Sequence, residues 1–143
     1  MTMLKQQKTR EMKVKEFHSA FNVDIDSQPR ANLVELRKKL ILEEAHEVAE
    51  SLEVIEMQLI RGKPVSKEQT TALLKELCDL QYVLSGTIVS LDILKTHNFD
   101  AAFNLVHKSN MSKLDSNGNV VYDANGKVLK GENYKAPDLN QLI

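Results

Sequence analysis

The sequence predicts an all-α fold, an antiparallel bundle of about four helices followed by a C-terminal β-hairpin or ordered loop. Apolar residues recur at helical spacing through 31–60 and 66–95, and a Gly-Lys-Pro breaker separates these two stretches. Strong turn signals gather after residue 113. With 143 residues, the chain is predicted to form a single domain over 1–143. Its helical core would span about 9–112, and the hairpin and tail about 113–143.

The composition fits a soluble globular protein, with 42% hydrophobic and 27% charged residues. A net charge of -1 argues against wholesale binding to a nucleic acid polymer or an anionic membrane. No apolar stretch approaches the roughly 18 residues of a membrane span, and the polar, lysine-rich segment 1–15 does not resemble a secretory signal. We therefore expect a cytoplasmic protein. The single cysteine, Cys78, excludes an intrachain disulfide and is predicted to be a packed free thiol.

The first two helices are predicted over 9–21 and 31–60. Phe17 and Phe21 lie near one face of the first helix, where they either pack in the core or help to stack a base. A polar segment that contains Pro29 ends this helix. Asn32 or a neighbour is the possible cap of the second.

The third helix should begin at Ser66, because Ser66 and Gln69 have the spacing of a capping box, and should continue to about 95. A shorter helix is predicted over 99–111. Asp-Ser-Asn-Gly and Asn-Gly turn signals then border two β-prone pieces, so 114–131 should form the hairpin or ordered loop, with 134–137 extended against the body.

Two pairs of carboxylates interrupt the apolar faces of the long helices. At about 100° per residue, Glu44 and Glu47 fall in the middle of the apolar arc of 31–60, while Glu43 lies near its edge. Glu76 flanks the apolar stripe of the third helix, and Asp79 lies just beyond it. His46 points well away from the arc and is predicted to be structural, as is His107.

These carboxylates predict a metal site. Residues three apart are neighbours on a helix surface, so the two pairs would converge if the helices pack antiparallel. Burying like charges costs several kcal/mol each, which a divalent cation offsets. Oxygen donors suit Mg²⁺, with Mn²⁺ as a possible substitute. A di-iron site would need two Glu-x-x-His steps facing inward, which the chain lacks. A solvated acidic face remains the alternative, and we expect it for the glutamates from Glu50 onward.

The pattern Glu43-Glu44-x-x-Glu47 followed by Glu76-x-x-Asp79 resembles the signature of the all-α nucleoside triphosphate pyrophosphohydrolases. This is the MazG superfamily, which includes the dimeric dUTPases and the phosphoribosyl-ATP pyrophosphatases. The surrounding segments look like a MazG-like subgroup, and the resemblance covers roughly residues 17–137. The segments that carry it are 36–41, 75–83, 106–114 and 126–131.

The resemblance implies Mg²⁺-dependent hydrolysis of a (d)NTP to the (d)NMP and pyrophosphate, in house-cleaning or control of the nucleotide pool. It implies four metal ligands, Glu44, Glu47, Glu76 and Asp79. Glu43 would be a further ligand or would orient the attacking water, and we choose it as the catalytic base. Relatives often have alanine or serine where this chain has Cys78. A phosphoribosyl-ATP substrate is less expected, because the chain continues well past the compact helical core.

Basic and amide side chains are candidates for holding the nucleotide. Lys113 is the first choice for a phosphate contact, followed by Lys127 and Lys130 in the tail and by Arg37, which lies two turns before Glu44. The last three could equally be solvated charges. Asn110 could read a base edge or cap its helix.

The apolar residues of the third helix cover a broad arc that needs a partner, most simply a second subunit. The resembled family assembles as dimers or dimers of dimers, and its active sites can borrow residues from the partner. The C-terminal tail is the candidate for that exchange. The competing hypothesis is a non-catalytic helical module that binds nucleotide or protein without turnover. Neither the preferred base nor the attacked phosphorus follows from the residues.

Overall fold

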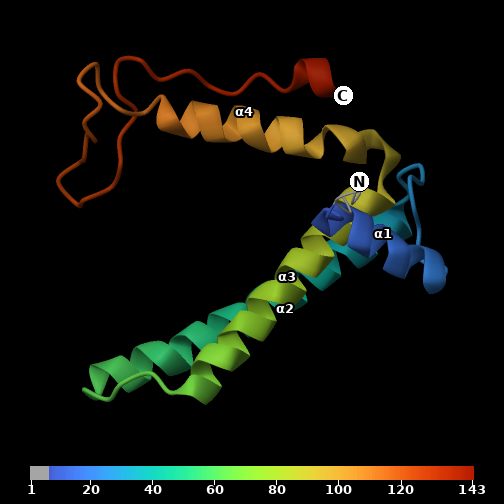
Figure 1. Ribbon diagram of the computed structural model, residues 1–143, viewed down its shortest axis with the longest axis horizontal. Coiled ribbons are helices and arrows are strands. Elements are labelled where there is room, and N and C mark those ends of the chain that lie inside the picture. The colour runs from blue at the N-terminus through green and yellow to red at the C-terminus, as the bar shows by residue number, and fades with distance from the viewer. Residues whose placement is uncertain (1–6) are drawn as a thin grey trace, which may run out of the picture. The chain divides into compact units, whose positions relative to one another are not determined.

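The computed structural model describes residues 7–143, so residues 1–6 of the polar N-terminal segment lie outside the described part (Figure 1). The chain divides into two compact units, Met1–Ile93 and Leu94–Ile143. The described residues contain four α-helices and no strand, which confirms the predicted helical class. The single-domain description stays a prediction.

Three helices build the first unit: α1 (Arg10–Ala20), α2 (Ala31–Ile60) and α3 (Lys67–Ser90). Figure 1 shows α2 and α3 side by side as a long hairpin. Their order is antiparallel, because Arg37 near the start of α2 bonds to Val83 and Thr87 near the end of α3, while Gln58 near the end of α2 bonds to Pro64 just before α3 begins. Helix α1 packs on α3. The antiparallel pairing that brings the two acidic segments together is therefore present.

Local sequence accounts for the starts of α3 and α1. The Ser66 hydroxyl accepts a bond from the Gln69 amide at 3.1 Å and the Gln69 side chain accepts one from the Ser66 amide at 2.9 Å, so the predicted capping box is confirmed. Thr9 caps α1 in a similar way. Helix α2 begins after Arg30, whose side chain makes no cap, rather than at a cap supplied by Asn32.

Helix α3 ends at Ser90, and the prediction that it continues to residue 95 is wrong. The carbonyls of Val89 and Ser90 accept bonds at 2.9 Å from the amides of Asp26 and Ser27 in the α1–α2 loop. Leu91 is extended and forms a parallel bridge with Ser27. A distant loop thus supplies partners for the last carbonyls of the helix and directs the chain into the 3₁₀ turn η1 (Asp92–Leu94).

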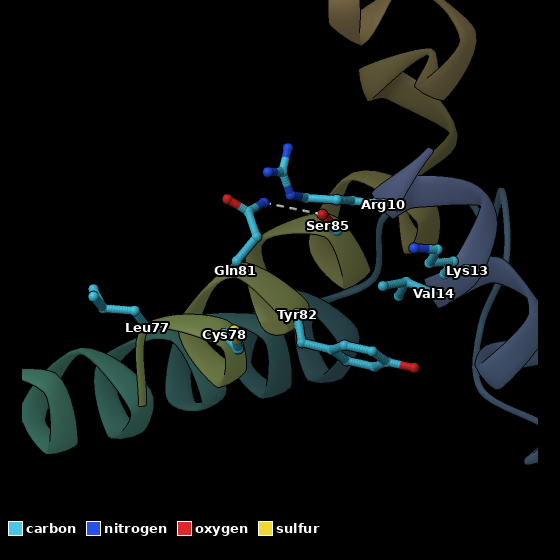
Figure 2. Close-up of a pocket in the computed structure, with 8 residues that line it drawn as sticks. All are labelled: Arg10, Lys13, Val14, Leu77, Cys78, Gln81, Tyr82 and Ser85. Carbon is cyan, nitrogen blue, oxygen red and sulfur yellow. Dashed lines mark hydrogen bonds between the residues drawn. The ribbon is translucent and has the colours of Figure 1, made fainter. Parts of the chain in front are cut away.

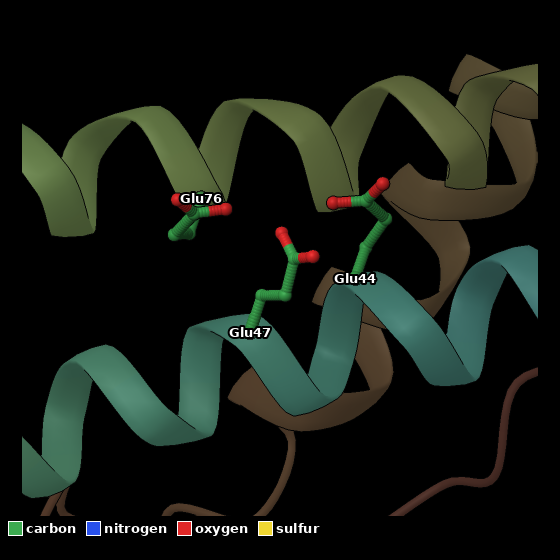
Figure 3. Close-up of side chains that lie close together, drawn as sticks. All are labelled: Glu44, Glu47 and Glu76. Carbon is green, nitrogen blue, oxygen red and sulfur yellow. The ribbon is translucent and has the colours of Figure 1, made fainter.

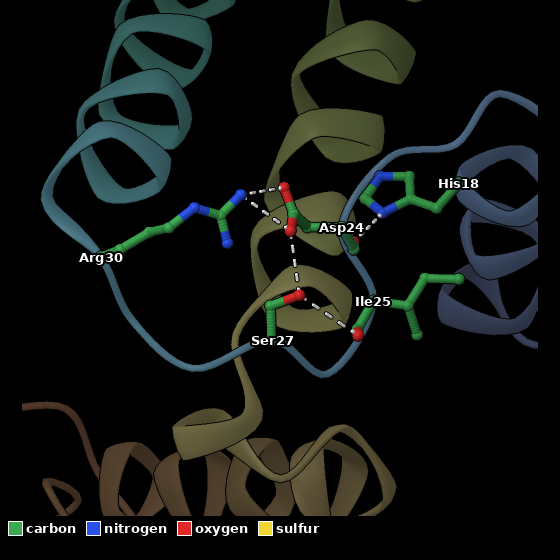
Figure 4. Close-up of polar contacts among 5 residues, drawn as sticks. All are labelled: His18, Asp24, Ile25, Ser27 and Arg30. Carbon is green, nitrogen blue, oxygen red and sulfur yellow. Dashed lines mark hydrogen bonds and ion pairs between the residues drawn. The ribbon is translucent and has the colours of Figure 1, made fainter.

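The α1–α2 loop is held by Asp24 (Figure 4). Its carboxylate accepts two bonds from Arg30, at 2.8 and 2.9 Å, and one from the Ser27 hydroxyl at 3.0 Å. These donors, Arg30 first, lower the pKa of Asp24. The backbone carbonyl of Asp24 accepts a bond from Nδ1 of His18 at 2.9 Å. The α1–α2 loop, which bonds to the last carbonyls of α3, is therefore also hydrogen-bonded to α1.

The second unit consists of the 3₁₀ turn η2 (Thr96–Asn98), helix α4 (Phe99–Met111) and a tail ending in η3 (Asn140–Leu142). The tail runs back along α4. The hydroxyl of Ser109, a buried residue, donates to the Lys135 carbonyl at 2.7 Å, and Ser112 accepts from the Lys135 amide at 2.9 Å.

Two loops of the tail share one geometry. The Asp115 carboxylate accepts from the amides two and four residues ahead, and Asp123 does the same, at 2.8–2.9 Å. In each loop a glycine with φ near +80° follows, Gly118 at +76° and Gly126 at +80°. Tyr122 and Val128 form one isolated antiparallel bridge around the second loop, and no strand forms in the described tail. The segment is thus a looped tail in which the predicted hairpin is not shown.

The first unit encloses little apolar volume by itself. Its fully buried apolar side chains are few, and large apolar residues on α2 and α3 stay exposed. The predicted apolar faces therefore remain partly uncovered, with Leu36, Val54, Leu77 and Leu84 exposed. No helix among the described residues is long and apolar enough to cross a membrane.

Candidate metal centre and active site

Three glutamates from two helices converge between α2 and α3 (Figure 3). Glu44 and Glu47 lie one turn apart on α2, and Glu76 faces them from α3. Each offers a carboxylate oxygen, and these oxygens lie within 4.8 Å of one another. The i, i+3 spacing on α2 supplies one side of the cluster, and the antiparallel hairpin supplies the other.

The pKa values of Glu44 and Glu47 are both raised. Burial raises the pKa of Glu44, and the negative charge of Asp79 adds to it. A hydrogen bond to Glu76 is the main cause that raises the pKa of Glu47, and the negative charge of Glu44 raises it further. Oxygen Oε2 of Glu44 is buried and finds no hydrogen-bond partner among the described residues. A buried, unpartnered carboxylate oxygen beside two further carboxylates is an arrangement that a bound cation would stabilise.

The cluster fits a hard divalent cation. All three groups are carboxylates, the donors that Mg²⁺ and Mn²⁺ prefer, and they are close enough to contact one ion together. Asp79 is near enough to act on Glu44 but does not belong to the close trio. Its Oδ2 lies 2.7 Å from the ammonium of Lys75 one turn earlier. Glu43 is exposed on α2 beside Glu44.

Arg37 lies inside the first unit rather than at its surface. It is 5% exposed and donates from Nη2 to the Val83 carbonyl at 2.8 Å and from Nε to the Thr87 hydroxyl at 3.2 Å. Burial lowers the pKa of its guanidinium. Gly86 makes room for it, because a Cβ there would lie 2.5 Å from Nη2. These contacts make Arg37 a link between α2 and α3, and its phosphate role stays a prediction.

The other predicted nucleotide-binding residues fall into two groups. At the end of α1, Phe17 stacks with Phe21, the residue that follows the helix, with ring centroids 4.5 Å apart, and Phe17 meets Tyr82 of α3 edge-on at 5.6 Å. The remaining residues all belong to the second unit: Asn110, Lys113, Lys127 and Lys130. Lys113 is half-buried, Asn110 and Lys127 are exposed, and the ammonium of Lys130 lies 4.6 Å from the centre of the Tyr134 ring. Their roles stay predictions.

A groove of about 470 Å³ lies between α1 and α3 (Figure 2). Tyr82 and Cys78 contribute to it, whereas Phe17 and Phe21 are not among its lining residues. Gln81 donates to the Ser85 hydroxyl at 3.1 Å, which in turn donates to Glu11 at 2.9 Å. The thiol of Cys78 is exposed, so the expectation that it is packed is wrong. The full lining is Arg10, Lys13, Val14, Leu77, Cys78, Gln81, Tyr82 and Ser85.

Comparison with known proteins identifies the family of the chain. The model of the phosphoribosyl-ATP pyrophosphohydrolase family matches residues 14–110, a stretch that contains α2, α3 and the acidic residues of the candidate site, Glu43, Glu44, Glu47, Glu76 and Asp79. The chain belongs to this family. A search of curated proteins finds no match.

Phosphoribosyl-ATP pyrophosphohydrolases are part of the all-α NTP pyrophosphohydrolase superfamily, so the resemblance noted in the sequence is confirmed at that level. Family membership makes the chain a pyrophosphohydrolase, a hydrolase that acts on phosphoanhydride bonds of a nucleotide. The MazG-like subgroup is compatible with the match and stays a prediction.

Sequence reasoning missed Lys75 and the pair Ser85–Gly86. Lys75 has a readable signal, since it lies four residues before Asp79 and next to Glu76. Ser85 and Gly86 are both buried, and the lack of a side chain at Gly86 leaves room for the Arg37 guanidinium. Two adjacent small residues inside an otherwise bulky helix were the signal for that close approach.

Proposed function

We propose that the chain is a Mg²⁺-dependent pyrophosphohydrolase that converts a (d)NTP to the (d)NMP and pyrophosphate. This rests chiefly on the trio Glu44, Glu47 and Glu76, each of which offers a carboxylate oxygen within 4.8 Å of the others. Oxygen Oε2 of Glu44 is also buried without a hydrogen-bond partner among the described residues. Carboxylate-bound Mg²⁺ in proteins typically also binds substrate phosphates. The family match supports a nucleotide substrate.

In this proposal the three glutamates hold Mg²⁺, and Asp79 completes the acidic lining from α3. Bound Mg²⁺ would supply charge neutralisation at the triphosphate and a lowered pKa for an attacking water. Glu43, exposed beside the trio, accepts the proton of that water. The water oxygen forms a new bond to phosphorus as the phosphoanhydride bond breaks, which leaves the nucleoside monophosphate and pyrophosphate.

The test is pyrophosphate release with Mg²⁺ from a panel of dNTPs and NTPs, with phosphoribosyl-ATP included. Glu47→Gln removes one ligand charge with little change in shape, and we expect at least about a tenfold loss of turnover from the weaker hold on the cation. Glu53→Gln is the matched control, because Glu53 is exposed on the same helix outside the trio.

Turnover of phosphoribosyl-ATP alone would replace the (d)NTP assignment with the substrate of the matched family. No turnover of any nucleotide, with binding unchanged in Glu47→Gln, would favour a non-catalytic binding module.

We also propose that the first unit pairs with a second copy of the chain, as a dimer or dimer of dimers. The exposed side chains of Leu74, Leu77 and Leu84 on α3 leave an apolar face that water does not favour. Sedimentation at several protein concentrations measures the assembly. A monomer at all concentrations would contradict it.

A further inference from the structure

Lys75 contacts two of the carboxylates near the candidate metal centre. Its ammonium lies 2.7 Å from Oδ2 of Asp79 and 3.4 Å from both carboxylate oxygens of Glu76. The contact to Asp79 joins residues four apart on α3, whereas the contact to Glu76 reaches a member of the trio itself. The chain thus places a positive charge of its own, the Lys75 ammonium, next to Glu76.

The charge of Lys75 acts on the whole cluster. It opposes the rise in the pKa of Glu44 and of Glu47, both on the facing helix α2. A bond to Asp79, and then to Glu76, raises the pKa of Lys75 in return. Repulsion among the carboxylates is thus partly relieved by an ammonium, which occupies the electrostatic role that a bound divalent cation would take.

A cation bound by Glu76 and the Lys75 ammonium at 3.4 Å from the same oxygens would repel each other. Lys75 can move away, because its side chain is 63% exposed and its four-carbon stem is flexible. Glu76, with a side chain 17% exposed, has less freedom. The lysine is therefore the group that leaves. An ammonium released at this rim is also placed to meet the anionic oxygens of a triphosphate.

We propose that Lys75 is a displaceable counter-cation: it holds Glu76 and Asp79 in the metal-free protein, leaves when the divalent cation binds, and then contacts the triphosphate. This rests on the proposed function. It makes Lys75 a positioning residue whose charge weakens binding of the free cation and favours a cation that arrives together with a triphosphate. A plain surface ion pair between Lys75 and Asp79 would have neither effect.

The test is direct Mn²⁺ binding, measured from the free-ion paramagnetic resonance signal without nucleotide. Lys75→Met keeps the length and helix propensity of the side chain but removes its charge. We expect Mn²⁺ to bind more tightly, by up to about thirtyfold, the effect of removing one unit charge about 4 Å from a doubly charged ion in water. Lys75→Arg, which keeps the charge, should not tighten binding. Lys67→Met is the matched control, because Lys67 is an exposed lysine at the start of α3, away from the trio.

The second arm measures affinity for a non-hydrolysable triphosphate analogue at saturating Mn²⁺. Weaker binding by Lys75→Met supports the transfer of Lys75 to phosphate, and unchanged binding overturns that step. If Lys75→Met binds Mn²⁺ with unchanged or weaker affinity, the proposal that Lys75 acts as a displaceable counter-cation is wrong. Absence of saturable Mn²⁺ binding in both wild type and Lys75→Met overturns the proposed metal site together with this inference, which distinguishes the two failures.

Discussion

Gly86→Ala tests how closely α1, α2 and α3 meet. Gly86 is buried in α3, and a Cβ at this position would lie 2.5 Å from Nη2 of Arg37 and 3.1 Å from Nε2 of His18. Alanine is otherwise the better helix residue by about 1 kcal/mol. The substitution therefore opposes a favourable local effect with a tertiary clash.

The magnitude follows from what the clash displaces. Arg37 would lose its bonds to the Val83 carbonyl and the Thr87 hydroxyl, each worth about 1.5–3 kcal/mol because the donor is charged. Losing both, less the propensity gain, lowers the free energy of unfolding by about 2–5 kcal/mol. The guanidinium is 5% exposed, so water does not readily replace those partners.

Urea unfolding followed by far-ultraviolet circular dichroism, at one fixed protein concentration, measures this loss in a double-mutant cycle. In an Arg37→Met background the flexible thioether can yield, so Gly86→Ala should be neutral within about 1 kcal/mol. An equal cost in both backgrounds, or a Gly86→Ala protein as stable as wild type, would refute the reasoning.

Two further predictions concern stability. Ser66→Ala removes the hydroxyl that caps α3 and should lower the free energy of unfolding by about 1 kcal/mol in the same urea assay. His18 is 3% exposed, and burial lowers its pKa, so the unfolded chain binds the proton more readily; stability should be full above about pH 6.5 and should fall as the pH drops from there toward the lowered folded pKa.

Each of these predictions has a control. Thr70→Ala removes a neighbouring hydroxyl that bonds only back to the Ser66 carbonyl, and it should leave stability within about 0.5 kcal/mol of wild type. A cost equal to that of Ser66→Ala would contradict the capping argument. His18→Asn keeps a donor for the Asp24 carbonyl but cannot titrate. The loss of stability below about pH 6.5 should therefore be smaller in this variant. An unchanged loss would assign the pH dependence to other groups.

Much of the first unit was readable from local pattern. Apolar periodicity and the breaker predicted α2 at 31–60, and the same reasoning predicted α4 at 99–111, as observed. The capping box at Ser66 involves residues three apart, and helical periodicity alone placed Glu44 and Glu47 on one face. Such features depend on near neighbours along the chain, so the sequence by itself determines them.

Tertiary structure decided what depends on distant partners. Helix α3 stops at Ser90 because a loop more than sixty residues earlier bonds to its last carbonyls. Arg37 fits against α3 because Gly86 has no side chain there. Glu76 joins Glu44 and Glu47 only through the antiparallel packing of α2 on α3, which also brings the charge of Lys75 to bear on the two α2 glutamates. Spacing along α2 places Glu44 and Glu47 on one face of that helix. Which charges lie near them depends on α3, because electrostatic interactions depend on distance in space and not on separation along the chain.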